Sequence, residues 1–172
     1  MSPNNDLKIV FGSMTFGKPS ECRLDALTLT FLTASPDTLG ARLHTAEGAA
    51  NIIDIFQQHG HQEVDSARVY GNGSTDEIIA QLDWQKRGLT MVIKLYPTRG
   101  GPLDAGGAYD HEPAEIRRGL LDSLKALDTK HIGMFYLHGP DRKHSFEDTL
   151  REVNNLHKEG YFDRFGISNY QS

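Results

Sequence analysis

Short apolar runs alternate along the chain with segments whose apolar residues recur at helical spacing. Runs of strand length occupy residues 7–11, 62–65, 90–95, 132–137 and 162–167. Apolar runs of four to eight residues bounded by turn residues are typical of strands in a buried parallel sheet. Helical segments separate most of these runs, which is the pattern of repeated βα units. The sequence therefore predicts an α/β fold built around a parallel sheet.

Four helices are expected. The first ends near Gly60, because glycine readily adopts the left-handed conformation that closes a helix. Ser74 and Glu77 match the S-x-x-E capping box and predict a short second helix that begins there. Pro113 suits the first turn of the third helix, and the fourth follows from Ser145. The expected buried faces are Ile116, Leu120, Leu124 and Leu127 in the third helix, and Phe146, Leu150, Val153 and Leu156 in the fourth.

Two regions depart from this alternation. Residues 20–39 interrupt the step from the first strand to the first helix, and their alternating Leu27, Leu29 and Phe31 fit either a strand or no regular element. Residues 99–110 are rich in glycine and follow the third strand. They are expected to form a loop over one end of the sheet, which either touches a substrate or is a solvated connector.

Composition narrows the class of protein. The 172 residues are 38% hydrophobic and 24% charged, as in one soluble globular domain with its own core. A net charge of -5 without a run of Lys or Arg argues against binding to nucleic acid or to an anionic membrane surface. The apolar runs are far shorter than the roughly 18 residues of a membrane span. The single Cys22 and the lack of a signal-peptide pattern in residues 1–6 favour a cytoplasmic setting.

Polar side chains stand at the carboxyl ends of the predicted strands. In a parallel barrel these ends share one face, where active sites are built. One such residue alone is as readily explained as an ordinary hydrogen-bonded polar group, but four in succession favour a functional site. The residues are Asp65, Lys94, His138 and the pair Ser168 and Asn169.

Tyr70 extends this set, because it follows Asp65 by five residues in a loop that turns over the same face. A phenol with a pKa of about 10 is a poor acid at neutral pH unless a cation such as Lys94 stabilises its phenolate. Asp65 would keep Lys94 charged and oriented. His138 could polarise a substrate carbonyl or share the proton with Tyr70. The set lacks a reductant, so a carbonyl reduction would need a dissociable hydride carrier.

Two other patterns carry less weight. Gly71 and Gly73 begin a G-x-G-x-x-G fingerprint, but its third glycine would fall at Asp76, so a Rossmann site is not predicted. His59 and His61 are spaced like a metal-binding pair, yet they lie at a helix end before the second strand, on the face opposite the polar set. We expect His59 and His61 to be ordinary surface histidines, and no metal site is predicted.

The residues that carry the polar set resemble those of the aldo-keto reductase family. Residues 64–71 resemble the segment in which that family's catalytic aspartate precedes its tyrosine, and Lys94 after residues 91–93 matches its lysine. Residues 120–127, running to 136–138, resemble the segment that leads into its histidine. Residues 166–170 resemble the motif whose serine and asparagine hold the nicotinamide carboxamide.

Residues 137–141, together with 45–73, look most like the aflatoxin aldehyde reductase branch, which reduces aldehydes and dicarbonyls with NADPH. The resemblance implies a partial (β/α)8 TIM barrel: residues 1–172 would carry roughly the first five βα units, with an atypical insertion at 20–39. It also implies that the catalytic residues are Asp65, Tyr70, Lys94 and His138, and that the NADPH-contacting residues are Ser168, Asn169 and Asp65.

Two functions follow from this resemblance. The first is an NADPH-dependent reductase that converts small aldehydes or ketones to alcohols, with Tyr70 as general acid. The second is a catalytically inactive, truncated member that acts as a regulatory or interaction module, because the family's remaining cofactor-binding segments follow the fifth strand. An open five-stranded sheet would expose its edge and apolar helix surface, which favours self-association or instability unless a partner covers them.

Overall fold

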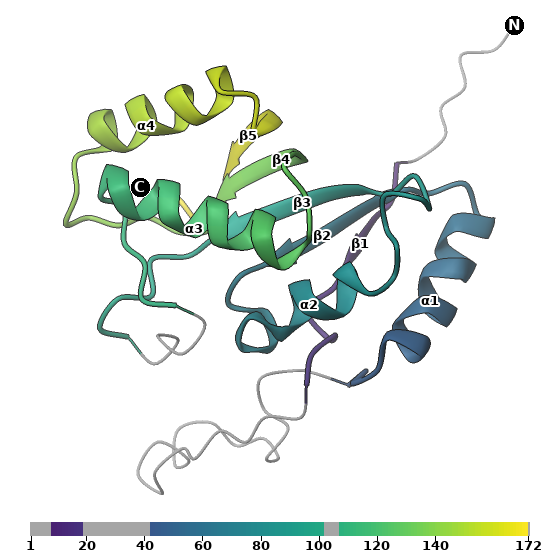
Figure 1. Ribbon diagram of the computed structural model, residues 1–172. Helices are drawn as coiled ribbons and strands as arrows, with labels where there is room; N and C mark the ends of the chain where they lie inside the picture. The colour runs from purple at the N-terminus through teal and green to yellow at the C-terminus, as the bar shows by residue number, and fades with distance from the viewer. Residues whose placement is uncertain (1–7, 19–41, 102–106, 172) are drawn as a thin grey trace, which may run out of the picture.

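A computed structural model describes residues 8–18, 42–101 and 107–171 of the chain. The predictions for residues 20–39 lie outside the described residues. The elements in chain order are β1 (Val10–Gly12), α1 (Ala46–Gln58), β2 (Glu63–Ala67), η1 (Tyr70–Gly73), α2 (Ser74–Ala80), β3 (Thr90–Leu95), α3 (Pro113–Ala126), β4 (Ile132–Leu137), α4 (Phe146–Lys158) and β5 (Phe162–Ile167) (Figure 1).

The five described strands form one parallel sheet in the order β1-β2-β3-β4-β5, so the predicted sheet of repeated βα units is confirmed. Figure 1 shows the strands side by side in sequence order. The register places Lys94 of β3 between Ala67 of β2 and Tyr136 of β4. Because neighbouring strands are parallel and in this register, the carboxyl ends of β2 to β5 meet along one edge of the sheet.

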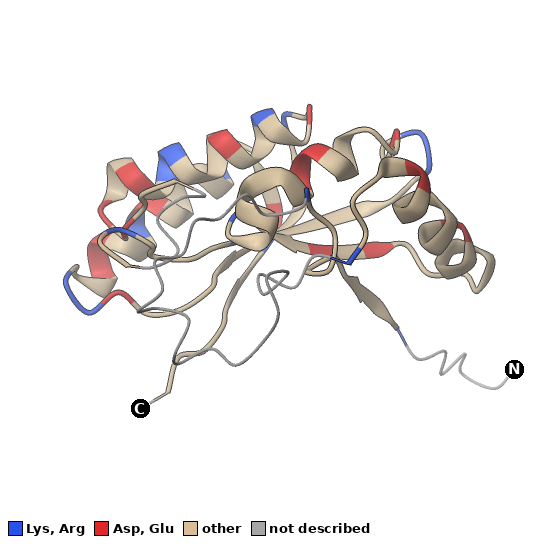
Figure 2. Ribbon diagram, turned by 90° about the horizontal axis from the view of Figure 1, so that it is seen from below, with Lys and Arg blue, Asp and Glu red and all other residues tan. Residues whose placement is uncertain are grey.

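The four helices lie together on one face of the sheet (Figure 2). Consecutive helices contact each other, α1 with α2, α2 with α3 and α3 with α4. No helix within the described ranges combines the length and apolar character that crossing a membrane requires. The core lies between the helices and the sheet and includes Ile53, Ile79, Met91, Ile93, Ile116, Leu120, Phe135 and Leu156.

Local sequence explains where several helices begin and end. Thr45 caps α1, because its Oγ1 accepts a hydrogen bond from the Gly48 amide at 3.1 Å. Gly60 follows α1 with φ +81°, as predicted for a glycine that closes a helix. Pro113 lies in the first turn of α3, and Ser145 caps α4. The predicted inner face of α3 is confirmed: all four of its residues are at most 3% exposed.

The capping box predicted at Ser74 is wrong, although a helix does begin there. The Ser74 hydroxyl donates to the carbonyl of Gly71 and accepts from the amide of Lys18 at 2.9 Å. The N-cap position belongs to Gly73, whose φ is +88°. Because the Ser74 hydroxyl bonds to the turn that precedes the helix, it does not cap the amide of residue 77.

The predicted burial of the fourth helix holds for only half of its apolar residues. Val153 and Leu156 are buried, but Phe146 and Leu150 are 49% and 47% exposed. The amino-terminal part of α4 borders β5, which pairs only with β4 among the described strands. Phe146 and Leu150 therefore line an open apolar groove of about 470 Å³, together with Leu137, Thr149, Phe165, Gly166, Ile167 and Tyr170.

The two ends of the glycine-rich loop after β3 are held together. The Arg99 amide donates to the carbonyl of Tyr109 at 2.8 Å, and the Arg99 side chain pairs with Asp110 at 2.6 Å. Tyr109 is itself buried. These ends are therefore packed against the fold, which differs from a wholly solvated connector; residues 102–106 lie outside the described ranges.

Candidate active site

The polar residues predicted at the strand ends lie along the same edge of the sheet. Lys94 lies in β3, and His138 and Ser168 directly follow β4 and β5. Asp65 does not end its strand as predicted, because β2 continues to Ala67. The His138 amide donates to the Leu95 carbonyl at 2.8 Å, and the Ser168 amide donates to the Leu137 carbonyl at 2.9 Å. The strand ladder thus continues one residue past each strand and fixes the backbone that carries these two side chains.

Lys94 and Asp65 form an ion pair at the centre of this edge. The Lys94 Nζ lies 2.7 Å from Asp65 Oδ1 and 2.8 Å from Oδ2. Burial by itself lowers the pKa of Lys94, but hydrogen bonding and charge from Asp65 and Tyr70 outweigh it and raise that pKa above its ordinary value. The ammonium is therefore charged at neutral pH and held in one place by the carboxylate.

Tyr70 begins the η1 turn, which brings its ring over the ion pair. The Lys94 Nζ lies 5.2 Å from the centroid of the Tyr70 ring. The turn continues through Gly71, Asn72 and Gly73, whose φ angles are +50°, +56° and +88°. A Cβ on Gly71 would lie 2.9 Å from the Gly17 Cα, so the backbone approaches too closely for any larger residue.

His138 lies between two tyrosines. Its ring meets Tyr70 edge to face at a centroid distance of 5.9 Å and Tyr96 at 5.6 Å. Burial, and secondarily the charge of Lys94, lower the pKa of His138 to about 4. The imidazole is therefore neutral at pH 7, and one of its ring nitrogens carries a hydrogen that it can donate.

Ser168 and Asn169 border the same region. The Asn169 Nδ2 donates to the His138 carbonyl at 2.7 Å and to Ser168 Oγ at 3.1 Å. These bonds leave the Ser168 hydroxyl hydrogen as a donor and the Asn169 side-chain oxygen as an acceptor. A primary carboxamide offers the complementary acceptor and donor, so this pair fits the nicotinamide end of NADPH.

Sequence reasoning missed three side chains beside this set. Tyr96 contacts His138, and Arg68 and Asp76 form an ion pair of 3.3 Å beneath the η1 turn. In the sequence, Asp76 stands out only because it occupies the place of the third glycine of a G-x-G-x-x-G fingerprint. Its spacing of eight residues from Arg68 matches no local pairing rule, because Arg68 lies in the loop between β2 and η1 and Asp76 lies in α2. The sequence signal that could have revealed this pair is Asp76 itself, a charged residue on the buried side of the second helix.

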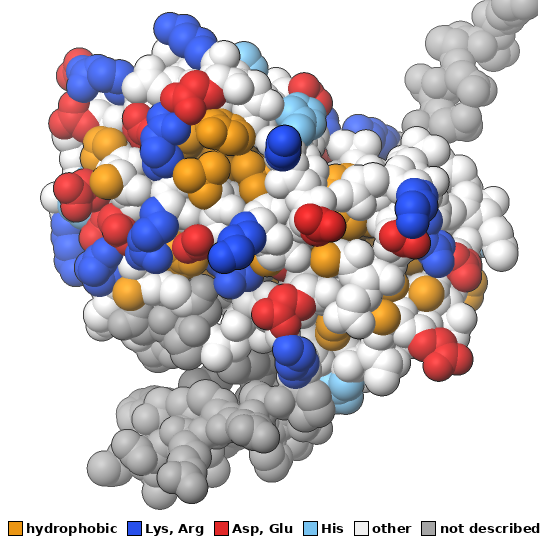
Figure 3. Space-filling view, in the orientation of Figure 1, with side chains coloured by type: hydrophobic (Ala, Val, Ile, Leu, Met, Phe, Trp, Pro, Cys, Tyr) orange, Lys and Arg blue, Asp and Glu red, His pale blue; other side chains and the backbone are white. Residues whose placement is uncertain are grey.

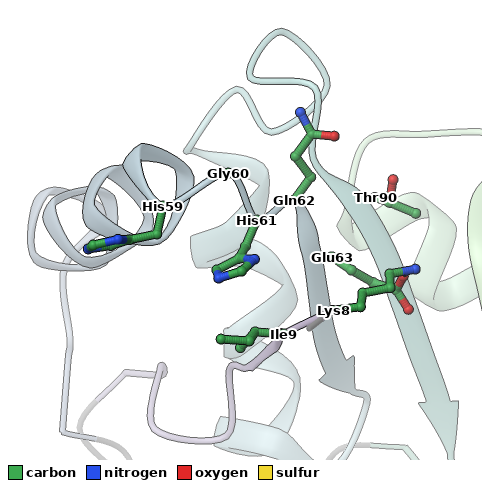
Figure 4. Close-up of a pocket in the computed structure, with 8 residues that line it drawn as sticks. All are labelled: Lys8, Ile9, His59, Gly60, His61, Gln62, Glu63 and Thr90. Atoms are coloured by element: carbon green, nitrogen blue, oxygen red, sulfur yellow. The ribbon is translucent and has the colours of Figure 1, made fainter. Parts of the chain in front are cut away.

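A second pocket of about 640 Å³ lies at the opposite end of the strands (Figure 4). Glu63, at the amino end of β2, pairs with Lys8 there and with Arg164 at 3.1 Å. Figure 4 shows the rings of His59 and His61 pointing in different directions. Within the described residues, no group of three or more His, Cys, Asp or Glu side chains is arranged to hold a metal ion.

Comparison with known proteins relates this architecture to one family. A sequence model of the aldo/keto reductase family matches residues 8–172. Aldo-keto reductase pigE of Monascus ruber is 43% identical over 173 residues, which cover 100% of this chain and 46% of that protein. Aflatoxin B1 aldehyde reductase member 2 of Mus musculus is 34% identical over 134 residues, which cover 78% of this chain and 35% of that protein. The chain thus spans less than half the length of these relatives.

Solved structures agree on the fold. An aldo-keto reductase from Bacillus halodurans, solved in its holo form, superposes with a TM-score of 0.69 at 21% identity, covering 95% of this chain and 46% of that one. A glycerol dehydrogenase from Gluconobacter oxydans gives a TM-score of 0.68 at 25% identity, covering 94% and 44%. These similarities confirm the predicted partial barrel. With a family match over nearly all of its residues, the chain belongs to the aldo-keto reductase family.

Proposed function

We propose that this chain contributes the catalytic centre of an NADPH-dependent reductase that converts aldehydes or ketones to alcohols. The observation that carries the proposal is the convergence of an ion-paired lysine, a tyrosine and a neutral histidine at one edge of the sheet. Lys94 Nζ lies 2.7 Å from Asp65 and 5.2 Å from the Tyr70 ring centroid, and His138 meets that ring at 5.9 Å.

Tyr70 is the proton donor in this proposal. As a carbonyl oxygen gains negative charge, the phenol transfers its proton to that oxygen and becomes a phenolate. The neighbouring Lys94 ammonium stabilises the phenolate, because opposite charges within a few ångströms favour the ionised form. Asp65 keeps the ammonium charged and directs it toward Tyr70.

His138 orients the substrate. A neutral imidazole donates a hydrogen bond from its protonated nitrogen to the carbonyl oxygen without competing with Tyr70 for the role of acid. The lowered pKa of His138, about 4, suits this role, because an imidazolium beside Lys94 would add a second positive charge to the site.

Ser168, Asn169 and Asp65 are the residues that would contact NADPH, which supplies the hydride when bound. Ser168 and Asn169 would hold the carboxamide through the free hydroxyl hydrogen and the free amide oxygen. An NADPH-bound structure is known for a relative of the same fold, an aldo-keto reductase from Klebsiella pneumoniae with a TM-score of 0.60. The aldehyde class of substrate is supported by the names of the mouse and human relatives called aflatoxin B1 aldehyde reductase member 2.

A second candidate function is a catalytically inactive interaction module. The open groove beside β5 favours it, because Phe146, Leu150 and Ile167 are each about half exposed at 49%, 47% and 53%. The chain also covers only 46% of its Monascus relative. In this function the same fold would serve to bind another polypeptide.

Calorimetric titration of the purified chain with NADPH, with NADH as a control, separates the two functions. Saturable NADPH binding followed by aldehyde-dependent oxidation of NADPH is expected for the reductase. Tyr70→Phe should then lower kcat at least ~100-fold with little change in NADPH affinity. Tyr161→Phe, at a partly buried tyrosine that precedes β5, is the matched control and should leave kcat unchanged. A folded sample that binds no NADPH would contradict independent catalysis and favour the interaction module.

A further inference from the structure

We propose that Arg68 and Asp76 are positioning residues that hold the η1 turn and thereby place Tyr70 over Lys94. The inference rests on the proposed reductase function, in which Tyr70 donates the proton. Neither side chain belongs to the set that the strand ends predicted. They flank the turn along the chain: Arg68 lies between β2 and η1, and Asp76 lies in α2.

Asp76 anchors the arrangement from inside the protein. Its side chain is fully buried, and its two oxygens are used separately: Oδ1 accepts from Ser66 Oγ at 2.8 Å, and Oδ2 accepts from Arg68 Nη1 at 3.3 Å. Ser66 lies in β2, next to Asp65. A buried carboxylate is unfavourable unless it is paired and hydrogen-bonded, so this geometry fixes both partners relative to β2.

Arg68 connects that anchor to both ends of the Tyr70 segment. Its Nη1 also donates to the Gly73 carbonyl at 3.2 Å, at the end of η1. Its backbone amide donates to the Lys94 carbonyl at 3.3 Å. Burial lowers the pKa of Arg68, but Asp76 and the Tyr109 hydroxyl outweigh it, so the guanidinium remains charged. One residue therefore ties the turn to the strand that carries Lys94.

The turn needs such support because its backbone is unusual. Gly71, Asn72 and Gly73 all have positive φ, and Asn72 does so with a side chain. Glycine adopts positive φ without strain, but the same conformation at Asn72 persists only where the surroundings impose it. A Cβ on Gly73 would lie 2.9 Å from Arg68 Nη2, so the guanidinium packs directly against the turn. Loss of this contact would let Tyr70 shift away from Lys94, and shifts of about 1 Å can cost ~100-fold in rate.

Arg68→Lys and Asp76→Asn test the proposal, with Arg117→Lys as the matched control. Lysine keeps the charge but lacks the planar guanidinium whose Nη2 packs against Gly73. Arg117 also pairs with two carboxylates, Glu152 at 2.7 Å and Glu159 at 2.6 Å, but on the outer surface of α3. The two test variants should lower kcat for carbonyl reduction about 10- to 100-fold with the KM for NADPH within about twofold of wild type. The control should change neither constant.

The His138 ring resonances provide a readout that does not require turnover. Tyr70 stands edge to face against His138, so its ring current shifts those resonances, and Tyr70→Leu calibrates the size of the effect. Arg68→Lys and Asp76→Asn should move the resonances in the same direction as Tyr70→Leu. If the wild-type chain binds NADPH but has no activity, or does not bind it, the proposed function fails while this readout still tests the positioning.

Ser66→Ala covers the case in which the stronger variants do not fold. It removes one bond to Asp76 and leaves the ion pair with Arg68 in place. A several-fold fall in kcat, or a smaller shift of the His138 resonances in the Tyr70→Leu direction, would support the proposal. Folded Arg68→Lys or Ser66→Ala protein with wild-type kcat and wild-type His138 resonances would overturn it.

Discussion

Protonation of His138 is opposed both by burial and by the nearby charge of Lys94, and each effect lowers the pKa of the imidazole. We expect the His138 ring to titrate near pH 4 and to remain neutral at neutral pH. A pH series of histidine ring NMR spectra, with His138 assigned through His138→Gln, measures this directly. Titration of the His138 ring near pH 6.5 would contradict both the burial of the ring and the effect of the Lys94 charge.

The same shift makes the stability of the chain depend on pH. The folded pKa of about 4 lies below the unfolded value of about 6.5. The stabilising contribution is therefore complete above pH 6.5 and is lost as the pH falls from 6.5 toward 4. Melting temperatures at pH 7 and pH 4.5 should differ more for wild type than for His138→Gln. Equal differences would mean that His138 does not contribute to acid sensitivity.

Asp65→Asn tests the ion pair at the centre of the site. Without the carboxylate, burial is no longer outweighed and the pKa of Lys94 should fall. Because the pair is partly buried, we expect the free energy of unfolding to drop by about 1–3 kcal/mol. The Lys94 13Cε titration reports the pKa, and urea unfolding reports the stability. Asp163→Asn, at an exposed carboxylate of β5, is the control and should change neither.

At the scale of single elements, α3 packs closely on β3 through Gly119. A Cβ on Gly119 would lie 2.5 Å from Leu95 Cδ1, and Leu95 is only 1% exposed, so it has little room to move. We expect Gly119→Ala to destabilise the chain by about 1–3 kcal/mol through overpacking. The higher helix propensity of alanine offsets part of this loss. In urea unfolding, Leu95→Ala should relieve this cost, so the double variant should lose less than the sum of the single losses. Strict additivity would show that the two residues do not collide.

The sequence predicted where the helices and strands lie better than it predicted which side chains other elements cover or bond to. The five strand segments and the buried face of α3 follow from apolar spacing, which depends on neighbours close in the chain. The exposure of Phe146 and Leu150 does not, because a helix face is buried only if another element covers it. The capping box at Ser74 failed for a related reason: the left-handed turn at Gly71 to Gly73 uses the serine, and sequence spacing does not reveal that competition.

The site shows the same division. Asp65, Lys94 and His138 could be predicted because strand ends meet at one edge in any parallel sheet. Arg68 and Asp76 could not, because their pairing depends on how η1 folds back over β2. The catalytic roles assigned to the four residues remain predictions, as do the cofactor roles of Ser168 and Asn169. The structure adds that Asp65, Lys94, Tyr70 and His138 lie close to one another.

At the scale of the whole molecule, the charged surface and the apolar groove point to different behaviour. Acidic and basic side chains are interspersed over the face shown in Figure 3, as is typical of a surface that stays in water. The groove beside β5 is different, because Phe146, Leu150 and Ile167 are exposed there together and β5 lacks a second partner strand among the described ones. An unpaired strand next to exposed apolar side chains favours association.

We therefore expect the isolated chain to self-associate through the groove between α4 and β5. Sedimentation equilibrium at several loading concentrations should give a weight-average mass that rises above the monomer value. Leu150→Lys should shift the chain toward monomer, because a lysine on the groove would have to be desolvated for two copies to meet. Leu121→Lys, at a leucine 38% exposed on α3, is the control and should leave association unchanged. A chain that remains monomeric at all concentrations and melts cooperatively would show that the groove tolerates water, and the interaction module would then lose its main structural support.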